Sequence, residues 1–356
     1  MSAFTTKDWL AVLKNPPPKL SDGEVAAVLK DRYGLEGRLK ALDSERDQNI
    51  LVTLDGGEKR LLKIANASED PAVTNFQTEA FLHVERKDPA LSLSRVLRTT
   101  DGVAEFTIDH AGAPHIVRLF SWLEGIPLSA VPQAERPDNP EVLGDMLARL
   151  ALDLADFDHP AKDHTLLYDP RHAANLEPFL ALIDDAELHA LVKACMARFK
   201  RDVLPALERL PVQVVFNDLS PRNYIVDPAD TSEVVGLIDF GDMVCTPRIV
   251  DIAVACVYWV NSSATPLDRV ARFVAAYHRR SPLEKRELDL LLPLMLTRAM
   301  ILPLIYHWRA DMFPENRIYI MHNLPQARRV LEQLSAMNPA EAAALLAEAC
   351  GLQDIP

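Results

Sequence analysis

The sequence predicts an α+β protein with two parts: a small mixed-sheet part over residues 1–120 and a larger, mainly helical part over residues 121–356. Short β-branched segments with one amphipathic helix fill the first part, whereas long amphipathic helices dominate the second. A run of short β-branched segments within residues 212–238 interrupts these helices. Such an interruption is the place where we expect functional residues.

The composition fits a soluble protein with a large core. The chain has 356 residues, of which 49% are hydrophobic and 25% charged, and this size predicts about two domains. A net charge of -13 argues against a general affinity for nucleic acid or anionic membranes. The four cysteines form no C-x-x-C pair, so they imply neither a disulfide framework nor a zinc site, and we expect a cytoplasmic location.

Neither the N-terminal stretch nor the most apolar stretch of the chain is predicted to be a targeting or membrane segment. The stretch from Met1 to Asn15 lacks the apolar core that a secretory signal needs. The most apolar stretch, Leu290 to Trp308, carries Arg298 at its centre together with Pro293 and Pro303. A charge at that position would be costly in lipid, so we expect buried helices there.

The first part is predicted to hold four strands, with one helix before the first strand and another helix after the second strand. The turn Asp55-Gly56-Gly57 separates two strand segments, and apolar residues between Val73 and Glu85 recur at helical spacing. The predicted strands are Arg38–Asp55, Lys59–Ala65, Val96–Arg98 and Val103–Ile108, and the predicted helices are Asp22–Tyr33 and Val73–Glu85. In the second part, Glu141–Phe157 and Asp185–Leu210 are the clearest helices.

The interruption carries a constellation of oxygen-bearing side chains. If Tyr224–Val226 and Val234–Ile238 pair as an antiparallel hairpin, Asn223 and Asp239 meet at its open end. A carboxylate and an amide oxygen suit Mg²⁺, which takes few protein ligands. Asp218, five positions before Asn223, can reach a hydroxyl beside that metal. Asp and Asn are also ordinary turn residues, but their occurrence in this order favours a catalytic interpretation.

At these residues the chain resembles the kinase-like phosphotransferases, the superfamily of aminoglycoside phosphotransferases and choline kinase. Their loop has the form H-x-D-x-x-x-x-N and is followed by a D-F-G-like triplet, here Asp239-Phe240-Gly241. The resemblance implies a two-lobed protein-kinase-like fold in which Asp218 is the catalytic base and Asn223 and Asp239 hold Mg²⁺. It also implies that phosphate passes from ATP or GTP to a hydroxyl. Phe216 stands at the His position, which in the kinase template mainly supports the loop.

The same resemblance assigns the nucleotide side. It makes Lys63 the phosphate-binding lysine and Glu79 its ion-pair partner, with Gln77 and Glu85 nearby in sequence. The phosphate-cradling turn would be residues 43–49, which contain no glycine, so side chains would share the work. The candidates in this turn are Ser44, Arg46 and Gln48, and the alternative is a plain polar hairpin turn. Backbone groups of Trp122 and Leu123 would bind the base, although Trp122 is also a candidate core residue.

Several strings resemble the hydroxylysine kinase branch of this superfamily, over about residues 20–330. They are residues 44–49, 62–66, 157–160 with 168–170, and 238–242. The branch implies an amino-bearing hydroxy compound as acceptor, most of all a hydroxylysine-type hydroxy amino acid. An aminoglycoside, homoserine, or choline or ethanolamine remains an alternative acceptor. The expected partners are therefore this small molecule and a nucleotide.

Four further residues or groups have two interpretations each. Asp242 faces the acceptor's amine or caps a helix. Arg298 pairs with a buried acid or binds a substrate carboxylate. Asp251, at a predicted helix start, is either functional or structural, and the structural role is expected. The aromatic residues Tyr258, Trp259, Tyr306 and Trp308 could cage a quaternary ammonium, but their helical spacing favours core packing.

A non-catalytic alternative is a pseudokinase that only senses a nucleotide. Phe216 and the glycine-free turn favour this alternative. The presence of Asp218, Asn223, Asp239 and Lys63 favours an enzyme.

Overall fold

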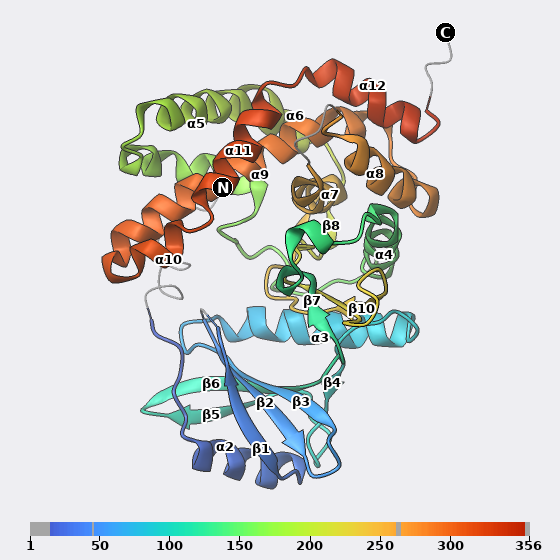
Figure 1. The fold of residues 1–356 in the computed structure, drawn as a ribbon. Helices are drawn as coiled ribbons and strands as arrows, with labels where there is room; N and C mark the ends of the chain where they lie inside the picture. Colours follow the sequence, from blue (N-terminus) through green and yellow to red (C-terminus); the bar gives the residue numbers. More distant parts are fainter. Residues whose placement is uncertain (1–14, 45, 261–264, 353–356) are drawn as a thin grey trace.

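The computed structural model describes residues 15–44, 46–260 and 265–352 and shows a sheet lobe and a helical lobe (Figure 1). The sheet has the order β1-β2-β3-β6-β4, with β5 paired to β6, and all of these pairs are antiparallel. Its strands are β1 (Gly37–Leu42), β2 (Gln48–Leu54), β3 (Lys59–Ile64), β4 (Val96–Leu97), β5 (Phe106–His110) and β6 (Ala113–Ser121). The predicted two-lobed α+β architecture is confirmed.

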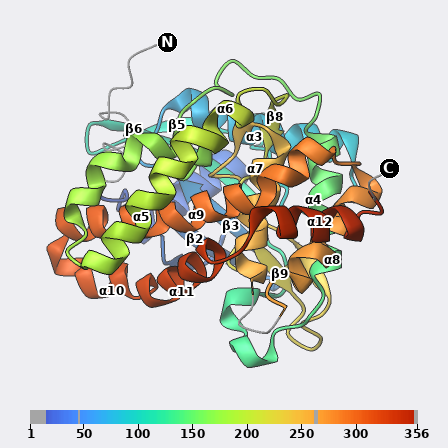
Figure 2. The same ribbon diagram turned by 90° about the horizontal axis from the view of Figure 1, so that it is seen from above.

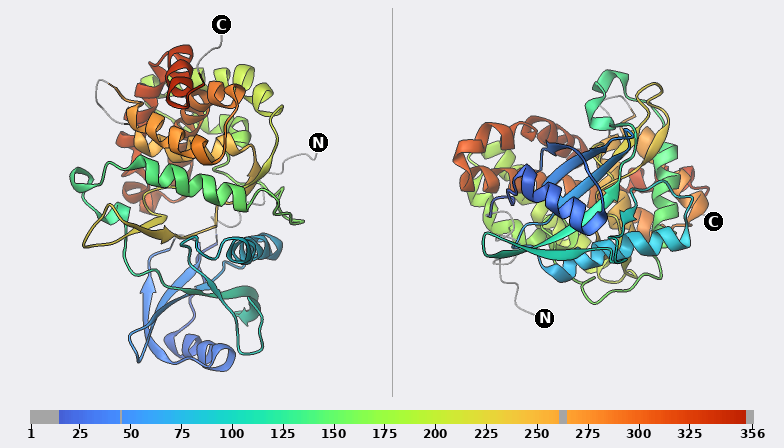
Figure 3. Two further views of the ribbon diagram at one scale, coloured as in Figure 1. Left: turned by 90° about the vertical axis from the view of Figure 1, so that its right-hand side faces the viewer. Right: turned by 90° about the horizontal axis from the view of Figure 1, so that it is seen from below.

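One face of this sheet is covered by the first helix of the described chain. This helix, α2 (Asp22–Val28), begins with a capping box between Ser21 and Glu24 and continues as a π-helical turn, η1 (Leu29–Tyr33). It lies against the sheet (Figure 3) and buries Val25 and Leu29 in a small core with β2, β3 and β6. The alternation of buried side chains along β2 and β3 provides the other half of that core.

The opposite face of the sheet carries α3 (Pro71–Lys87), which lies between the sheet and the helical lobe (Figure 1). Asp70 caps its start, since its side chain accepts a hydrogen bond from the N–H of Ala72 at 2.8 Å, and Pro71 occupies the first turn. The predicted apolar spacing is confirmed, because Phe76, Ala80 and Phe81 are buried in the main core of the helical lobe. The helix α3 therefore packs as much against the helical lobe as against its own sheet.

The helical lobe is built around α9 (Lys285–Met312), a single 28-residue helix (Figure 2). Its length and composition would allow it to cross a membrane, but 78% of its most apolar stretch is buried inside the protein. The prediction of buried helix is thus confirmed, although the helix continues through Pro293 and Pro303. The other helices are α4 (Pro140–Asp153), α5 (Ala186–Arg198), α6 (Leu204–Leu207), α7 (Arg248–Cys256), α8 (Asp268–Arg280), α10 (Arg317–Met321), α11 (Leu324–Ser335) and α12 (Pro339–Ala349). The 3-10 segments are η2 (Leu128–Ala130), η3 (Gln133–Glu135), η4 (Pro170–Leu182), η6 (Val257–Trp259) and η7 (Pro314–Asn316), and η5 (Phe199–Val203) is a π-helical turn.

Short strands interrupt the helices as predicted. The strands β9 (Tyr224–Val226) and β10 (Val234–Leu237) form the expected antiparallel hairpin, and β7 (Ile126–Pro127) adds to β9. A second pair joins β8 (Gln213–Val215) to β11 (Val244–Thr246). Neither β7 nor β11 is predicted from the sequence.

The hairpin is joined to the segment that precedes β4. The N–H of Leu237 donates to the carbonyl of Ser92 at 3.0 Å, and the N–H of Ser94 donates to the carbonyl of Leu237 at 3.3 Å. This approach depends on Gly236, since a Cβ there would lie 2.6 Å from the carbonyl oxygen of Ser92. The hairpin and the sheet lobe are therefore held together at a glycine contact.

Asp251 holds the loop that follows β8, as its expected structural role requires. Its carboxylate accepts a hydrogen bond from the N–H of Asn217 at 2.8 Å, and Asn217 has a left-handed φ of 61°. The side-chain amide of Asn217 donates to the carbonyl of Asp242 at 3.1 Å. Burial raises the pKa of Asp251 to about 7, while hydrogen bonds from the backbone of Asn217 and Phe216 oppose this rise.

We predict that Gly236→Ala lowers the free energy of unfolding by about 1–3 kcal/mol, because the added methyl must push the hairpin away from Ser92. Thermal or urea unfolding measures the change. Gly56→Ala is the matched control: a Cβ at Gly56 meets nothing within 4 Å, so its stability should stay close to wild type. Equal stability of the two variants would contradict the close contact at Gly236.

We predict that Asp251→Asn becomes more stable relative to wild type as the pH rises. The folded-state pKa of about 7 exceeds the ordinary pKa of 3.8, so the contribution of Asp251 to stability is complete below about pH 4 and is lost toward pH 7. The asparagine keeps an oxygen acceptor for Asn217 but cannot ionise. The melting temperature of the variant minus that of wild type should therefore increase between pH 4 and 7 and then level off.

A companion variant, Asp251→Ala, removes the acceptor and should lower the melting temperature throughout this pH range. A difference between Asp251→Asn and wild type that did not depend on pH would show that Asp251 stays ionised in the folded protein.

Candidate active site

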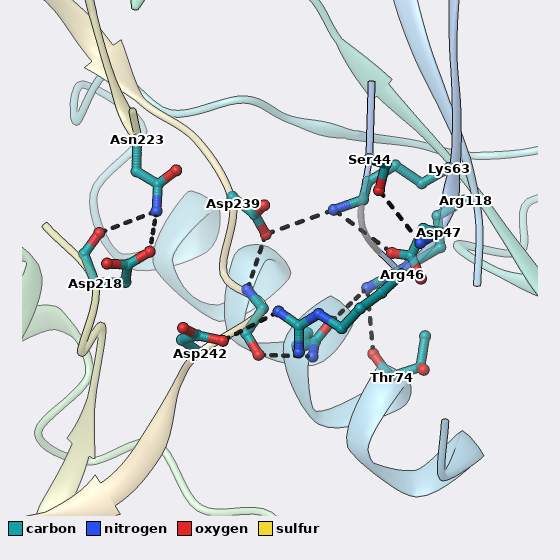
Figure 4. Close-up of polar contacts among 12 residues, drawn as sticks. Ser44, Arg46, Asp47, Lys63, Thr74, Arg118, Asp218, Asn223, Asp239 and Asp242 are labelled. Atoms are coloured by element: carbon teal, nitrogen blue, oxygen red, sulfur yellow. Dashed lines mark hydrogen bonds and ion pairs between the residues drawn. The ribbon is translucent and has the colours of Figure 1, made fainter. Parts of the chain in front are cut away.

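The catalytic loop, residues 216–223, places Asp218 and Asn223 in direct contact (Figure 4). The amide nitrogen of Asn223 donates to the Asp218 carboxylate at 2.5 Å and to the Asp218 carbonyl at 3.1 Å. Two backbone bonds tighten the loop, from Ser220 to the carbonyl of Asp218 and from Asn223 to the carbonyl of Ser220. The loop is thus closed on itself, and the side chain of Asp218 has a fixed direction.

Asp218 is half-buried, and its surroundings favour the protonated form. Burial raises the pKa of Asp218 to about 8, and the negative charges of Asp242 and Asp239 act in the same direction. The positive charge of Arg298 and the hydrogen bond from Asn223 act against them. A raised pKa makes the ionised carboxylate a stronger proton acceptor, which is the property of a general base.

The oxygen atoms of Asn223 and Asp239 could hold a metal ion. The N–H of Ile238 donates to the carbonyl of Asn223 at 2.9 Å, so the two residues lie side by side at the open end of the hairpin, as predicted. Because the amide nitrogen of Asn223 faces Asp218, its oxygen is left for another partner. The side chain of Asp239 is 45% exposed and has a left-handed φ of 63°, with one oxygen bonded to the N–H of Gly241.

This donor set fits a hard divalent cation. Within the residues that the structure describes, no group of three His, Cys, Asp or Glu side chains is placed to hold a metal. One amide oxygen and one carboxylate would leave most of an Mg²⁺ shell to water and phosphate oxygens, which is the usual arrangement for that ion.

Lys63 on β3 lies beside Asp239, as the assigned roles require. Its ammonium group is 3.5 Å from the Asp239 carboxylate and 3.9 Å from that of Asp47 (Figure 4). The predicted pairing of Lys63 with Glu79 is wrong for this structure, because the acids that contact Lys63 are Asp47 and Asp239. Two residues along a helix turn the side chain by about 200°, so α3 presents Gln77 to the site and Glu79 elsewhere.

Arg118 on β6 is a functional candidate that sequence reasoning missed. It lies directly across from Lys63 in the β3–β6 register, and only 4% of it is exposed. Its guanidinium donates to the side chain of Gln77 at 3.1 Å, and Gln77 donates in turn to the carbonyl of Gly241 at 3.4 Å. Burial lowers the pKa of Arg118, and nearby acids oppose this. The pattern that indicated Lys63, a single cation in an aliphatic strand, would also have indicated Arg118.

The turn before β2 contains one residue that reaches the helical lobe. Arg46 donates to the carboxylate of Asp242 at 3.2 Å, while Ser44 accepts a hydrogen bond from the N–H of Asp47 at 3.2 Å. The prediction of a nucleotide contact for Gln48 is not supported, because its amide makes two hydrogen bonds with the backbone of Leu20. Glu45, part of the predicted turn, lies outside the described residues.

The candidate hinge residues Trp122 and Leu123 lie between β6 and β7, where the chain passes from the sheet lobe to the helical lobe. Both are half-buried. The position of Leu123 is further fixed by Gly236, whose Cβ, if present, would lie 2.8 Å from the Leu123 side chain.

Asp242 and Arg298 are charged neighbours of Asp218. The capping alternative for Asp242 is wrong, because the next helix, α7, begins at Arg248. The Asp242 side chain is 13% exposed and pairs with Arg46. Arg298, on α9, is buried, with its guanidinium carbon 5.2 Å from the centre of the Tyr168 ring.

The aromatic residues of the helical lobe mostly form core, as their spacing predicts. Trp259 and Trp308 are buried, and Trp308 stacks on Phe179 at a centroid distance of 5.2 Å. Tyr258 is the exception, with 39% of it exposed. These residues therefore do not share one open cage.

Comparison with known proteins agrees with this geometry. The model of the phosphotransferase enzyme family matches residues 38–288. Hydroxylysine kinase of Danio rerio is 27% identical over 335 residues, covering 90% of this chain and 93% of that protein. Amicoumacin kinase hAmiN, solved with AMP-PNP, Ca²⁺ and Ami, superposes with a TM-score of 0.67 at 13% identity and covers 90% of this chain and 97% of its own. A microcompartment-associated aminopropanol kinase gives 0.63 at 18% identity, covering 93% and 96%.

The solved structures confirm the kinase-like fold, and the curated relatives share nearly the whole length of the chain. The chain belongs to the phosphotransferase enzyme family, and it is a small-molecule kinase that transfers phosphate from a nucleotide to a hydroxyl group.

Proposed function

We propose that this kinase uses ATP or GTP with Mg²⁺ to phosphorylate a hydroxyl of an amino-bearing acceptor, a hydroxylysine-type hydroxy amino acid. The observation that carries the proposal is the position of Asp218: it is held by Asn223, lies next to Asp239 and Asp242, and has a raised pKa. The hydroxylysine kinases among the relatives support the choice of acceptor.

In this proposal Asp218 orients the acceptor hydroxyl and takes its proton as the oxygen attacks the terminal phosphorus. Asn223 and Asp239 would hold Mg²⁺, which supplies charge neutralisation on the phosphates when bound. Lys63 and Arg118 face the phosphates from neighbouring strands, and Arg46 approaches them from the turn before β2. Catalysis would then consist mainly of positioning and of stabilising charge that develops in the transition state.

The pairs formed without ligand are consistent with these roles. Lys63 contacts Asp239, and Arg46 contacts Asp242, so these two cations now face acids proposed for the metal and the acceptor. A bound nucleotide with its metal would offer each cation a phosphate instead. Asp239 would then be available to the metal, and Asp242 to the amine of the acceptor.

The site favours an acceptor amine that is not a quaternary ammonium. The carboxylate of Asp242 acts on Asp218 electrostatically, and its negative charge suits an ammonium group of the acceptor. Choline would need an open aromatic cage, and the burial of Trp259 and Trp308 argues against one. An aminoglycoside, homoserine and ethanolamine remain alternative acceptors, and the test below compares them.

The replacement of the motif His does not favour a pseudokinase. Phe216 is fully buried and packs against Phe240 with ring centroids 5.3 Å apart. It thus supports the loop by packing, while Asp251 holds the backbone of Asn217. The groups that the chemistry needs stay in place without the imidazole.

We predict that Asp218→Asn lowers kcat by about 10²–10⁴-fold, the usual contribution of a general base, while nucleotide binding is retained. Phosphate transfer to the acceptor measures kcat, and the shift in melting temperature with nucleotide and Mg²⁺ measures binding. The exposed Asp31, in η1 on the far side of the sheet lobe, provides the control variant Asp31→Asn, which should behave as wild type. Wild-type turnover in Asp218→Asn would exclude Asp218 as the base.

The acceptor is tested by offering 5-hydroxylysine, homoserine, ethanolamine, choline and an aminoglycoside with ATP and with GTP. We expect 5-hydroxylysine to give the highest kcat/KM and choline the lowest. A higher kcat/KM for any other compound, with loss of that activity in Asp218→Asn, would keep the kinase mechanism but overturn the proposed acceptor.

A further inference from the structure

Arg298 is a buried cation near Asp218, and part of its hydrogen-bonding capacity is unused. It lies in the middle of α9, and 4% of its surface is exposed. Two of its three guanidinium nitrogens, Nε and Nη1, have no hydrogen-bond partner in the described part of the chain. A guanidinium carries five N–H donors, and burying donors without acceptors lowers the stability of the folded protein. A group this costly calls for an explanation.

The neighbours of Arg298 do not provide the missing acceptors. The ring of Tyr168 lies under the guanidinium at 5.2 Å, a cation–π contact that uses the face of the group and leaves its edges free. Among the acids, Asp218 has the largest electrostatic effect on Arg298, but its carboxylate is bonded to Asn223. Asp242, the other acid that acts on Arg298, is bonded to Arg46.

One neighbour of Arg298 reaches the surface. Tyr258 interacts with Arg298 through a hydrogen bond and through charge, and it is 39% exposed, so a residue next to the guanidinium borders solvent. The electrostatic neighbours of Arg298 also include both Asp218 and Asp242. One buried cation and two acids therefore lie within electrostatic range of one another.

We propose that Arg298 binds the carboxylate of the acceptor, which makes hydroxy amino acids, and not amino alcohols, the substrate class of this kinase. The inference rests on the kinase function proposed above and deepens it. A zwitterionic acceptor would place its carboxylate at Arg298, an ammonium group at Asp242 and its hydroxyl at Asp218. The planar guanidinium suits this role because it can bind a carboxylate through two parallel hydrogen bonds.

The proposal predicts strong discrimination against acceptors without a carboxylate. When a ligand lacks the group that a buried donor needs, the donor stays unpaired, and sites of this kind reject such analogues by up to about 10⁴–10⁵-fold. Because Arg298 is not fully satisfied and is charged, we expect wild type to prefer 5-hydroxylysine over its decarboxylated analogue, 1,5-diaminopentan-2-ol, by about 10²-fold or more in kcat/KM.

The test compares these two acceptors in wild type, Arg298→Gln and Arg286→Gln. In Arg298→Gln the preference should fall to about tenfold or less, mainly through a higher KM for 5-hydroxylysine. Arg286, also on α9, is exposed and paired with Glu284, so Arg286→Gln is the matched control and should keep the wild-type preference. Arg298→Lys keeps the charge but not the fork, and should restore part of the preference if the glutamine variant does not fold.

The outcomes separate the two proposals. Equal kcat/KM for the two acceptors in wild type, or an equal loss for both in Arg298→Gln, would overturn the carboxylate assignment while leaving the kinase function intact. Absence of phosphate transfer by wild type to every acceptor, with either nucleotide, would overturn the proposed function itself. A shift in melting temperature with 5-hydroxylysine that is present in wild type and lost in Arg298→Gln supports the assignment without any turnover.

Discussion

A stack of three phenylalanine rings is the contact on which the site depends. Phe81 on α3 stacks on Phe240 with ring centroids 3.8 Å apart, and Phe240 packs edge-on against Phe216 at 5.3 Å. These three residues belong to α3, to the segment carrying Asp239, and to the catalytic loop. Because the functional side chains come from separate segments of the chain, their distances are only as fixed as this packing. The loss of the motif His is thereby compensated by a buried aromatic ring.

Charge balance between the lobes is the second constraint. The acids beside Asp218 raise its pKa, and each carboxylate in such a half-buried place costs free energy unless a cation faces it. Arg46 and Lys63 supply those cations from the sheet lobe. The unliganded site is therefore stabilised by the groups that would bind ligand, so that nucleotide and acceptor exchange partners within an existing network. An exchange of this kind costs less than ordering isolated charges on binding.

The sequence patterns that specified the structure well were local ones. The apolar spacing of α3, the hairpin of β9 and β10, and the approach of Asn223 to Asp239 at the open end of that hairpin are all confirmed in the fold. The wrong predictions concern residues for which strand register or helical phase determines whether the side chain faces the site. Glu79 and Gln77 differ by two positions on one helix, and only the tertiary structure shows which faces the site. Arg118 is a candidate because the β3–β6 register places it across from Lys63. Gln48 is not a candidate for nucleotide binding, because its side chain is bonded to the backbone of Leu20.

Arg298 is a residue in the middle of a core helix whose burial is unfavourable for folding. A methionine or leucine there would pack without unpaired donors, and replacing buried charges by apolar residues is often stabilising. Sites that bind ligands are where such unfavourable choices are expected, since the missing partner arrives with the substrate. The position of Arg298 beside Asp218 gives this cost a purpose, because the binding energy of a carboxylate would then hold the acceptor hydroxyl against the base. A residue that is unfavourable for folding alone thereby becomes evidence about the substrate.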